Sequence, residues 1–202
     1  MIDSTLRLYE TVADTYARVL PDLRAEAVSD LELIDRFGGM VPAGDSPVLD
    51  AGCGTGRMLP HLASLGLRPL AGVDISPAMA AHAQPRAPDT RIDVAPLTAL
   101  PFSDAGIRGL LCWYAIIHST AAEVAEVAKE AARVLVGGGP LLLAFQAGTG
   151  DRVVPRVYGH DVTLHAVLHE PDDVAATLKQ AGFEIVDTTR RDALPQEKHA
   201  QG

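Results

Sequence analysis

One ten-residue stretch, 48–57, constrains this chain more than any other part of its 202 residues. It reads Val-Leu-Asp-Ala-Gly-Cys-Gly-Thr-Gly-Arg, an apolar run that contains an acid and is followed by three alternating glycines. Glycine reaches positive φ easily and lets a ligand lie against bare backbone. A helix that begins after such a turn directs unpaired N–H groups toward it. The stretch therefore predicts a buried strand, a turn that holds a nucleotide-like cofactor, and the start of a helix.

The rest of the chain predicts alternating strands and helices. Apolar runs bounded by Gly and Pro predict strands at 47–51, 69–74, 90–94, 109–113, 141–146 and 183–188. Helical spacing of apolar residues predicts helices at 57–65, 77–83, 120–135 and 171–181, after two N-terminal helices separated at Pro21, the second over 26–37 and ended by Gly38-Gly39. This alternation predicts an α/β fold with a doubly wound, parallel sheet. Its ligands bind at the carboxyl ends of the strands, where strand order reverses.

Composition excludes several classes of partner. The net charge of −9 argues against a nucleic-acid partner, because phosphate binding needs clustered Lys and Arg. Two cysteines, Cys53 and Cys112, have neither zinc spacing nor a disulfide pattern. The N-terminus shows no targeting signal, and no apolar run is long enough to span a membrane. We expect a cytoplasmic protein with no membrane or nucleic-acid partner.

Two classes of cofactor use a glycine turn after a first strand. Dinucleotide enzymes need a third small residue where this chain has Arg57, and a pyrophosphate would meet the carboxylate of Asp50. An NAD(P)-dependent oxidoreductase is therefore a disfavoured alternative, and the absence of Gly-Lys-Ser/Thr excludes a P-loop. Asp74 ends the second strand, 22 residues after Gly52, where an acid accepts hydrogen bonds from ribose hydroxyls.

Five segments, in this order, resemble the class I S-adenosylmethionine (SAM) methyltransferases. They are the turn at 50–57, the Gly-Val-Asp-Ile-Ser-Pro-Ala-Met run at 72–79, the Leu-Pro-Phe segment at 100–104, the run at 111–118 and the turn at 132–140. The resemblance covers about residues 9–190 and is nearest to small-molecule enzymes of the ubiquinone and menaquinone biosynthesis type. It implies methyl transfer from SAM, with S-adenosylhomocysteine as product, to the O, N, S or C atom of a small organic acceptor.

The resemblance also implies a set of cofactor-binding residues. Asp50 would organise the turn and face the ammonium group, Asp74 would bind the ribose, and Ile75 and Met79 would flank the adenine. The usual adenine-binding carboxylate falls on Pro96, so we expect the Leu97 backbone, or Asp93 after a register shift, to replace it. The full predicted set is Asp50, Gly52, Cys53, Gly54, Thr55, Asp74, Ile75, Met79, Leu97, Trp113 and Tyr9.

The family's architecture sets further expectations for the fold. It implies a Rossmann-like, mostly parallel sheet of the seven-stranded type, with residues 1–40 as an N-terminal helical lid over the cleft and 41–202 as the SAM-binding domain. The family's last strand would follow residues 197–199, and the sequence ends at Gly202. We therefore expect a sheet whose last strand is truncated or comes from another segment. An uncovered edge invites pairing, so a monomer or a homodimer is expected.

Catalytic residues are less constrained, because methyl transfer depends mainly on alignment and needs a base only when the acceptor loses a proton. His118, five residues after Trp113, is the candidate base or acceptor-orienting group. Tyr16 lies seven residues after Tyr9 on the same helix face and is the second catalytic candidate. The candidate substrate-binding residues are Tyr114, Tyr158 and His160.

No metal is expected. The spacings of His160, His165 and His169 do not converge on one point, and Cys112-Trp113 lacks the carboxylate of metal-dependent catechol-type enzymes. A third hypothesis is a SAM-binding module without catalysis. Pro96 and the missing last strand keep it open.

Overall fold

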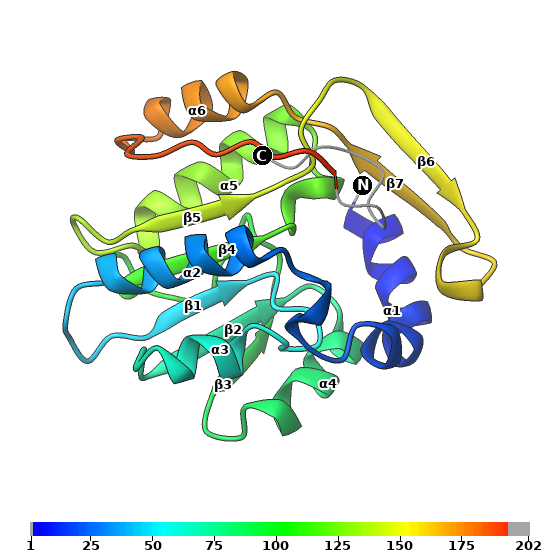
Figure 1. The fold of residues 1–202 in the computed structure, drawn as a ribbon, viewed down its shortest axis with the longest axis horizontal. Helices are drawn as coiled ribbons and strands as arrows, with labels where there is room; N and C mark the ends of the chain where they lie inside the picture. Colours follow the sequence, from blue (N-terminus) through cyan, green and yellow to red (C-terminus); the bar gives the residue numbers. More distant parts are fainter. Residues whose placement is uncertain (1, 194–202) are drawn as a thin grey trace.

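A computed structural model describes residues 2–193 of the chain and shows a central sheet of five parallel strands in the order β3-β2-β1-β4-β5 (Figure 1). The strands are β1 (Val48–Ala51), β2 (Leu70–Asp74), β3 (Arg91–Val94), β4 (Gly109–Trp113) and β5 (Leu141–Ala144). Strand β1 pairs with β2 on one side and with β4 on the other, so strand order reverses there. The carboxyl end of β1 is where such a sheet binds its ligand.

Helices cover both faces of the sheet. Helices α2 (Val28–Met40) and α3 (Leu59–Ser64) bury Ile34 and Leu62 against one face, while α5 (Ala121–Val134) and α6 (Pro171–Gln180) bury Val124 and Val174 against the other. Helix α4 (Pro77–Arg86) packs on β2 and β3. All five residues of β4 are buried because its side chains point alternately into the two layers. The predicted doubly wound fold is confirmed.

Helix α2 passes through the predicted stop at Gly38-Gly39 and ends at Met40. A Cβ added at Gly38 would lie 2.9 Å from the Leu65 Cδ1 atom. Gly38 therefore serves close packing against the end of α3, and the prediction that it ends the helix is wrong.

The predicted strand at 183–188 is also wrong, because these residues form no ladder with any described strand. A strand needs a partner for its backbone groups, and this segment is held by side chains instead. Phe183 packs against the core, Asp187 pairs with Arg36 at 2.9 Å, and the Arg191 guanidinium bonds to the buried Asp30 at 2.7 and 2.8 Å. The sheet is thus shorter than the seven-stranded type, and the expected last strand after 197–199 lies outside the described residues.

Two further elements stand beyond the carboxyl ends of the strands (Figure 1). One is α1 (Ile2–Val19), and the other is the hairpin, residues 151–167, made of β6 (Asp151–Pro155), the short helix η3 (Val157–Gly159) and β7 (Thr163–Val167). Leu8, Val12 and Ala13 of α1 form a separate apolar cluster with Met79 of α4 and with Leu164 of the hairpin. Helix α1 and the hairpin are therefore packed together over the ligand-binding end of the sheet.

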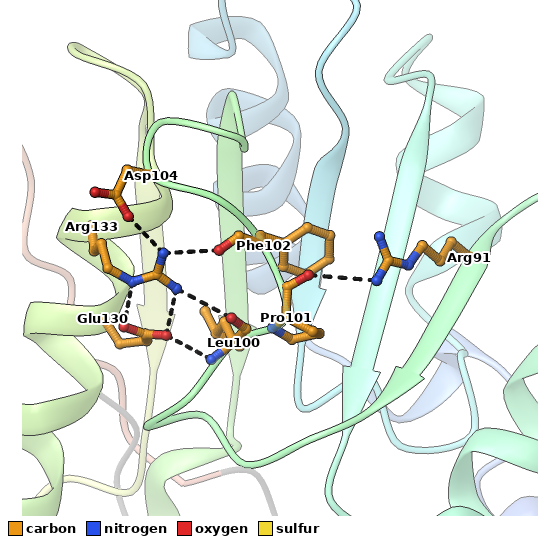
Figure 2. A network of polar contacts seen from close by, with 7 residues as sticks. All are labelled: Arg91, Leu100, Pro101, Phe102, Asp104, Glu130 and Arg133. Carbon is orange, nitrogen blue, oxygen red and sulfur yellow. Dashed lines mark hydrogen bonds and ion pairs between the residues drawn. The ribbon is translucent and has the colours of Figure 1, made fainter.

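Figure 2 shows a polar network that holds segment 100–104 between β3 and β4; its members are Arg91, Leu100, Pro101, Phe102, Asp104, Glu130 and Arg133. The Arg133 guanidinium donates to the carbonyl groups of Leu100 at 3.2 Å and Phe102 at 2.8 Å. The Glu130 carboxylate accepts from the Leu100 N–H at 2.7 Å and also pairs with Arg133. The network fixes the path of the chain just after residues 95–98, which line the cleft described below.

Replacing Arg133 by Met should lower the free energy of unfolding by about 1–3 kcal/mol, because carbonyl groups of segment 100–104 lose their donors. Urea denaturation measures this. The matched control is Lys129→Met on the same helix, whose pair with Glu126 is exposed and should change stability by less than about 0.5 kcal/mol. Equal effects of the two substitutions would show that the network does not hold the segment.

Candidate functional site

A cleft of about 420 Å³ lies at the carboxyl ends of the strands, beneath α1 and the hairpin. That volume is within the range of small-molecule sites. The predicted site residues that line it are Tyr9, Tyr16, Gly52, Gly54, Asp74, Ile75, Met79, Leu97, Trp113, Tyr114, His118 and Tyr158. These residues come from six separate parts of the sequence and are brought to one continuous cavity.

The glycine turn forms the floor of the cleft. The N–H groups of Gly52 and Cys53 both donate to the Val73 carbonyl, at 2.7 and 2.9 Å, which ties the turn to β2. A Cβ added at Gly52, where φ is +79°, would lie 2.2 Å from the Ala115 Cβ atom. Gly54, with φ of +53°, has nothing within 4 Å of an added Cβ, so its backbone faces open space. The turn therefore offers bare backbone to a ligand.

Asp74 closes the turn from the end of β2. Its Oδ2 atom accepts from the Gly54 N–H at 2.8 Å, and Oδ1 accepts from the Ser76 N–H at 2.9 Å. Burial raises the pKa of Asp74, and the bonds from the Ser76 and Gly54 N–H groups oppose that rise. Each carboxylate oxygen keeps a second lone pair, so Asp74 can still accept from two hydroxyls of a ligand.

Asp50 is buried directly before the turn, with 1% of its surface exposed. Its Oδ2 atom has no hydrogen-bond partner among the described residues. Burial raises the pKa of Asp50 to about 7; the Arg57 cation opposes the rise and the Asp74 charge adds to it. A buried carboxylate oxygen with no partner needs a donor. Asp50 therefore fits a cofactor that brings an ammonium group to this turn.

Four predicted residues are not among the residues that line the cleft: Asp50, Cys53, Thr55 and His160. Cys53 and Thr55 are buried beside the turn and are not among its lining residues, so contacts there would use their backbone. His160 lies in the hairpin, where its Nε2 atom is 2.9 Å from the Thr15 hydroxyl of α1. His160 thus joins the hairpin to α1 rather than lining the cavity.

Residues 95–98 line the end of the cleft expected for adenine, and they carry no carboxylate. Asp93 does not line the cleft, and one of its oxygens lies 2.7 Å from Arg91 Nε. The Leu97 N–H donates to no described acceptor, so it is available to a ligand. The geometry favours the Leu97 backbone over Asp93 as the replacement for the carboxylate absent at Pro96.

His118, which is buried, and Tyr9, which is half-buried, form a hydrogen-bonded pair that lines the cleft. The His118 Nδ1 atom is 2.6 Å from the His165 carbonyl oxygen, which can only accept, so Nδ1 carries the proton. Nε2 is then free to accept from the Tyr9 hydroxyl at 2.9 Å. Burial lowers the pKa of His118 and raises that of Tyr9 well above its usual value. The pair is therefore neutral, with a basic nitrogen directed at Tyr9.

Aromatic side chains form the wall next to this pair. Tyr16 lies edge-on to Tyr158, with ring centroids 5.4 Å apart, and Trp113 lies edge-on to Tyr114 at 5.3 Å. Tyr114 and Tyr158 have φ of +56° and +51°, which is uncommon for aromatic residues. Such strained backbone gathers at ligand sites, where the surrounding structure holds it.

Two acids that matter to the site were not identified from the sequence. Glu26 accepts from the Arg57 guanidinium and, through Oε2, from the Trp113 Nε1–H at 2.9 Å. Glu10 of α1 accepts from the Ser76 hydroxyl at 2.6 Å and from a backbone N–H of α4 at 2.8 Å. Glu26 links the N-terminal segment to the end of the glycine turn, and Glu10 links it to the start of α4. Both contacts cross long sequence separations, which no local spacing reveals. In the sequence, the position of Glu10 next to Tyr9 was the one feature that could have indicated a role for Glu10 at the site.

Within residues 2–193, no three His, Cys, Asp or Glu side chains are gathered as a metal ion would require. Among the helices of that same part of the chain, none has the length and apolar character needed to cross a membrane.

Comparison with known proteins bears on the identity of this site. The family described as "Methyltransferase domain" matches residues 48–139. The chain is 26% identical over 181 residues to the O-methyltransferase cnsE of Penicillium expansum, covering 82% of this chain and 62% of that protein. It is 29% identical over 149 residues to the uncharacterized methyltransferase YodH of Bacillus subtilis, covering 71% of this chain and 62% of that protein. The chain thus spans about 62% of the length of these two relatives.

The fold is similar to that of magnesium protoporphyrin IX methyltransferase (ChlM) from Synechocystis PCC 6803, solved with bound SAM. The TM-score is 0.72 at 19% identity, and the alignment covers 99% of this chain and 94% of that one. The matched domain contains the glycine turn, Asp50 and Asp74, and these residues lie together at the switch point of the sheet. Residues 48–139 thus match the methyltransferase domain family, and the chain has the fold of solved SAM-dependent methyltransferases.

Proposed function

We propose that the protein transfers the methyl group of SAM to a hydroxyl group of a small organic acceptor. When bound, SAM supplies an electrophilic methyl group for in-line displacement. The observation that supports this function best is that one cavity runs from the glycine turn and Asp74 to His118 and Tyr114. A cofactor site and a basic group are thereby held in a single space, as a transfer reaction needs.

The cofactor end of the cavity is assigned from its polar groups. Asp50 receives the ammonium group, and Asp74 accepts from the ribose hydroxyls. Ile75 and Met79 cover the adenine ring, whose edge meets the backbone of Leu97. The partnerless Oδ2 atom of Asp50 and the open space at Gly54 support this placement.

The acceptor end uses the Tyr9–His118 pair. An acceptor hydroxyl next to Tyr9 gives its proton to the Tyr9 oxygen while the Tyr9 proton passes to His118 Nε2, so the proton ends on the imidazole. The bond of Tyr9 to His118 uses the only hydroxyl proton of Tyr9. Tyr9 therefore serves the proton transfer, and binding to the cofactor carboxylate would require that bond to break.

The N-terminal segment 1–40 divides between two roles. Helix α1 contributes Thr5, Tyr9 and Tyr16 to the cleft and acts as its lid, which excludes water. Helix α2 buries Ile34 and Phe37 in the sheet and belongs to the structural domain formed by the rest of the chain.

The affinity for SAM should fall about tenfold between pH 8 and pH 6, because the raised pKa of Asp50, about 7, makes the carboxyl neutral below that pH. The neutral form cannot pair with an ammonium group. Calorimetric titrations across this range measure the effect. Asp50→Asn should bind SAM more weakly with a flat pH profile, and an equally steep profile in that variant would contradict the assignment.

Turnover is tested by following S-adenosylhomocysteine release over a library of phenols, alcohols, amines and thiols. The proposal is supported if wild-type protein forms product from hydroxyl compounds and the His118→Asn variant does not. SAM binding without turnover on any member would favour the non-catalytic module instead.

A further inference from the structure

Arg152 is placed in the acceptor half of the cleft by the alternation of β6. Asp151, Val153 and Pro155 of this strand are exposed, while Arg152 and Val154 are half-buried and line the cavity. The surrounding hairpin residues that line this half are Val154, Val157, Tyr158 and Leu164. A cationic group thus lines the cavity beside hairpin residues that are apolar or aromatic.

No carboxylate of residues 2–193 lies within ion-pair distance of Arg152. Its guanidinium donates a hydrogen bond to the Gln146 Oε1 atom, at 3.5 Å. Arg57, the other arginine of the cleft, is neutralised by Glu26. The chain has 26 acids against 17 Lys and Arg residues, so a shortage of acids does not explain the difference. A half-buried guanidinium without a counterion is unfavourable unless a ligand supplies the negative charge.

The acids of the cleft are already engaged by other groups. Asp74 accepts from two backbone N–H groups, and Glu123 accepts from the backbone and side chain of Thr120 at the start of α5. Within residues 2–193, the hydrogen bond of Arg152 is to Gln146 and not to either of these acids. The charge on Arg152 therefore remains available to a bound molecule.

The set of donors also indicates the kind of anion. The described lining residues include two arginines and no lysine, and Arg57 is paired, so one positive charge is available. A guanidinium binds a carboxylate through two parallel hydrogen bonds. The Gln146 amide nitrogen beside it is a further donor. A single guanidinium and an amide match the charge of a carboxylate, whereas a diphosphate would bring excess negative charge.

We propose that Arg152, with Gln146, binds a carboxylate of the acceptor, so that the acceptor is a hydroxy acid with an apolar or aromatic body. Arg152 is then a specificity-determining residue that holds the acceptor with its hydroxyl group toward Tyr9 and His118. This inference rests on the proposed methyl transfer and adds the chemical class of its substrate.

Binding of matched probes tests the inference. The probes are hydroxy acids and their primary amides, namely 4-hydroxybenzoate, salicylate and 4-hydroxycinnamate with their amides. Each is titrated by calorimetry into protein loaded with S-adenosylhomocysteine. At least one acid should bind wild-type protein about tenfold or more tightly than its amide, as expected for a charge-assisted pair worth about 1.4 kcal/mol. The ratio should fall to near one in Arg152→Gln and to an intermediate value in Arg152→Lys, which keeps the charge without the two-pronged geometry.

Arg156→Gln is the matched control, because it removes the same charge from the same hairpin at an exposed residue that does not line the cleft. It should keep the wild-type ratio. Equal binding of acids and amides to wild-type protein, no binding of any acid, or an acid preference that survives in Arg152→Gln would each overturn the inference. SAM titration of the same preparations separates the two proposals, because failure to bind SAM contradicts the proposed function, whereas normal SAM binding without acid preference contradicts only the role of Arg152.

Discussion

Replacing His118 by Asn should lower kcat for hydroxyl methylation by about 10²–10⁴-fold, the usual contribution of a general base. Asn keeps a donor for the His165 carbonyl but has no basic nitrogen in place of Nε2, which now accepts from Tyr9 at 2.9 Å. SAM affinity should change by less than about twofold, because the variant leaves the turn intact. Single-turnover kinetics with a responsive acceptor measures the chemical step.

The pH profile and Tyr9→Phe provide the controls for this prediction. Burial lowers the pKa of His118, so the ring is neutral above pH 7 and kcat should be flat there and fall in acid. The acid limb should vanish in His118→Asn. Tyr9→Phe keeps the ring but removes the relay oxygen and should also lower kcat. Full activity in Tyr9→Phe would contradict the relay, and full activity in His118→Asn would contradict the base.

Replacing Asp74 by Ala should weaken SAM binding by about 1–3 kcal/mol, or roughly 5–150-fold in Kd. The substitution removes the acceptor for the ribose hydroxyls and also releases the N–H groups of Gly54 and Ser76. The lost ribose acceptor and the released N–H groups both weaken the part of the cleft that holds the cofactor. Calorimetry with SAM and with S-adenosylhomocysteine should show equal losses, because the two molecules share the ribose.

Asp93→Ala is the matched control, since this acid lies one residue before the end of the neighbouring strand β3 and does not line the cleft. Its effect on Kd should be less than about twofold. Unchanged SAM affinity in Asp74→Ala, or an equal loss in Asp93→Ala, would show that the second-strand acid does not bind the cofactor.

The central fold was predictable because its signals are local. The apolar runs of β1, β2 and β4 are buried on both faces, as parallel strands between helices must be. The glycine turn was predictable because Gly52 and Gly54 adopt positive φ. Asp50 and Asp74 were predictable as well, because they lie in β1 and at the end of β2, and the strand and helix lengths between them set their spacing.

The remainder depended on contacts between distant parts of the chain. The Glu26 bridge to Arg57 and Trp113 spans 31 and 87 residues, and sequence spacing carries no trace of it. The tautomer of His118 depends on a carbonyl 47 residues away. Segment 183–188 has the apolar alternation of a strand, yet pairing decides strands, and no described strand pairs with it. Propensity alone could not resolve these features.

The most direct test of the account is a pair of calorimetric titrations of the wild-type protein at pH 8, one with SAM and one with NADH. Three features together predict one SAM molecule bound per chain and no measurable binding of NADH: the glycine turn, the ribose-binding position of Asp74, and the Asp50 oxygen that has no hydrogen-bond partner in the described part of the chain. Binding of NADH without binding of SAM would contradict the account at its centre.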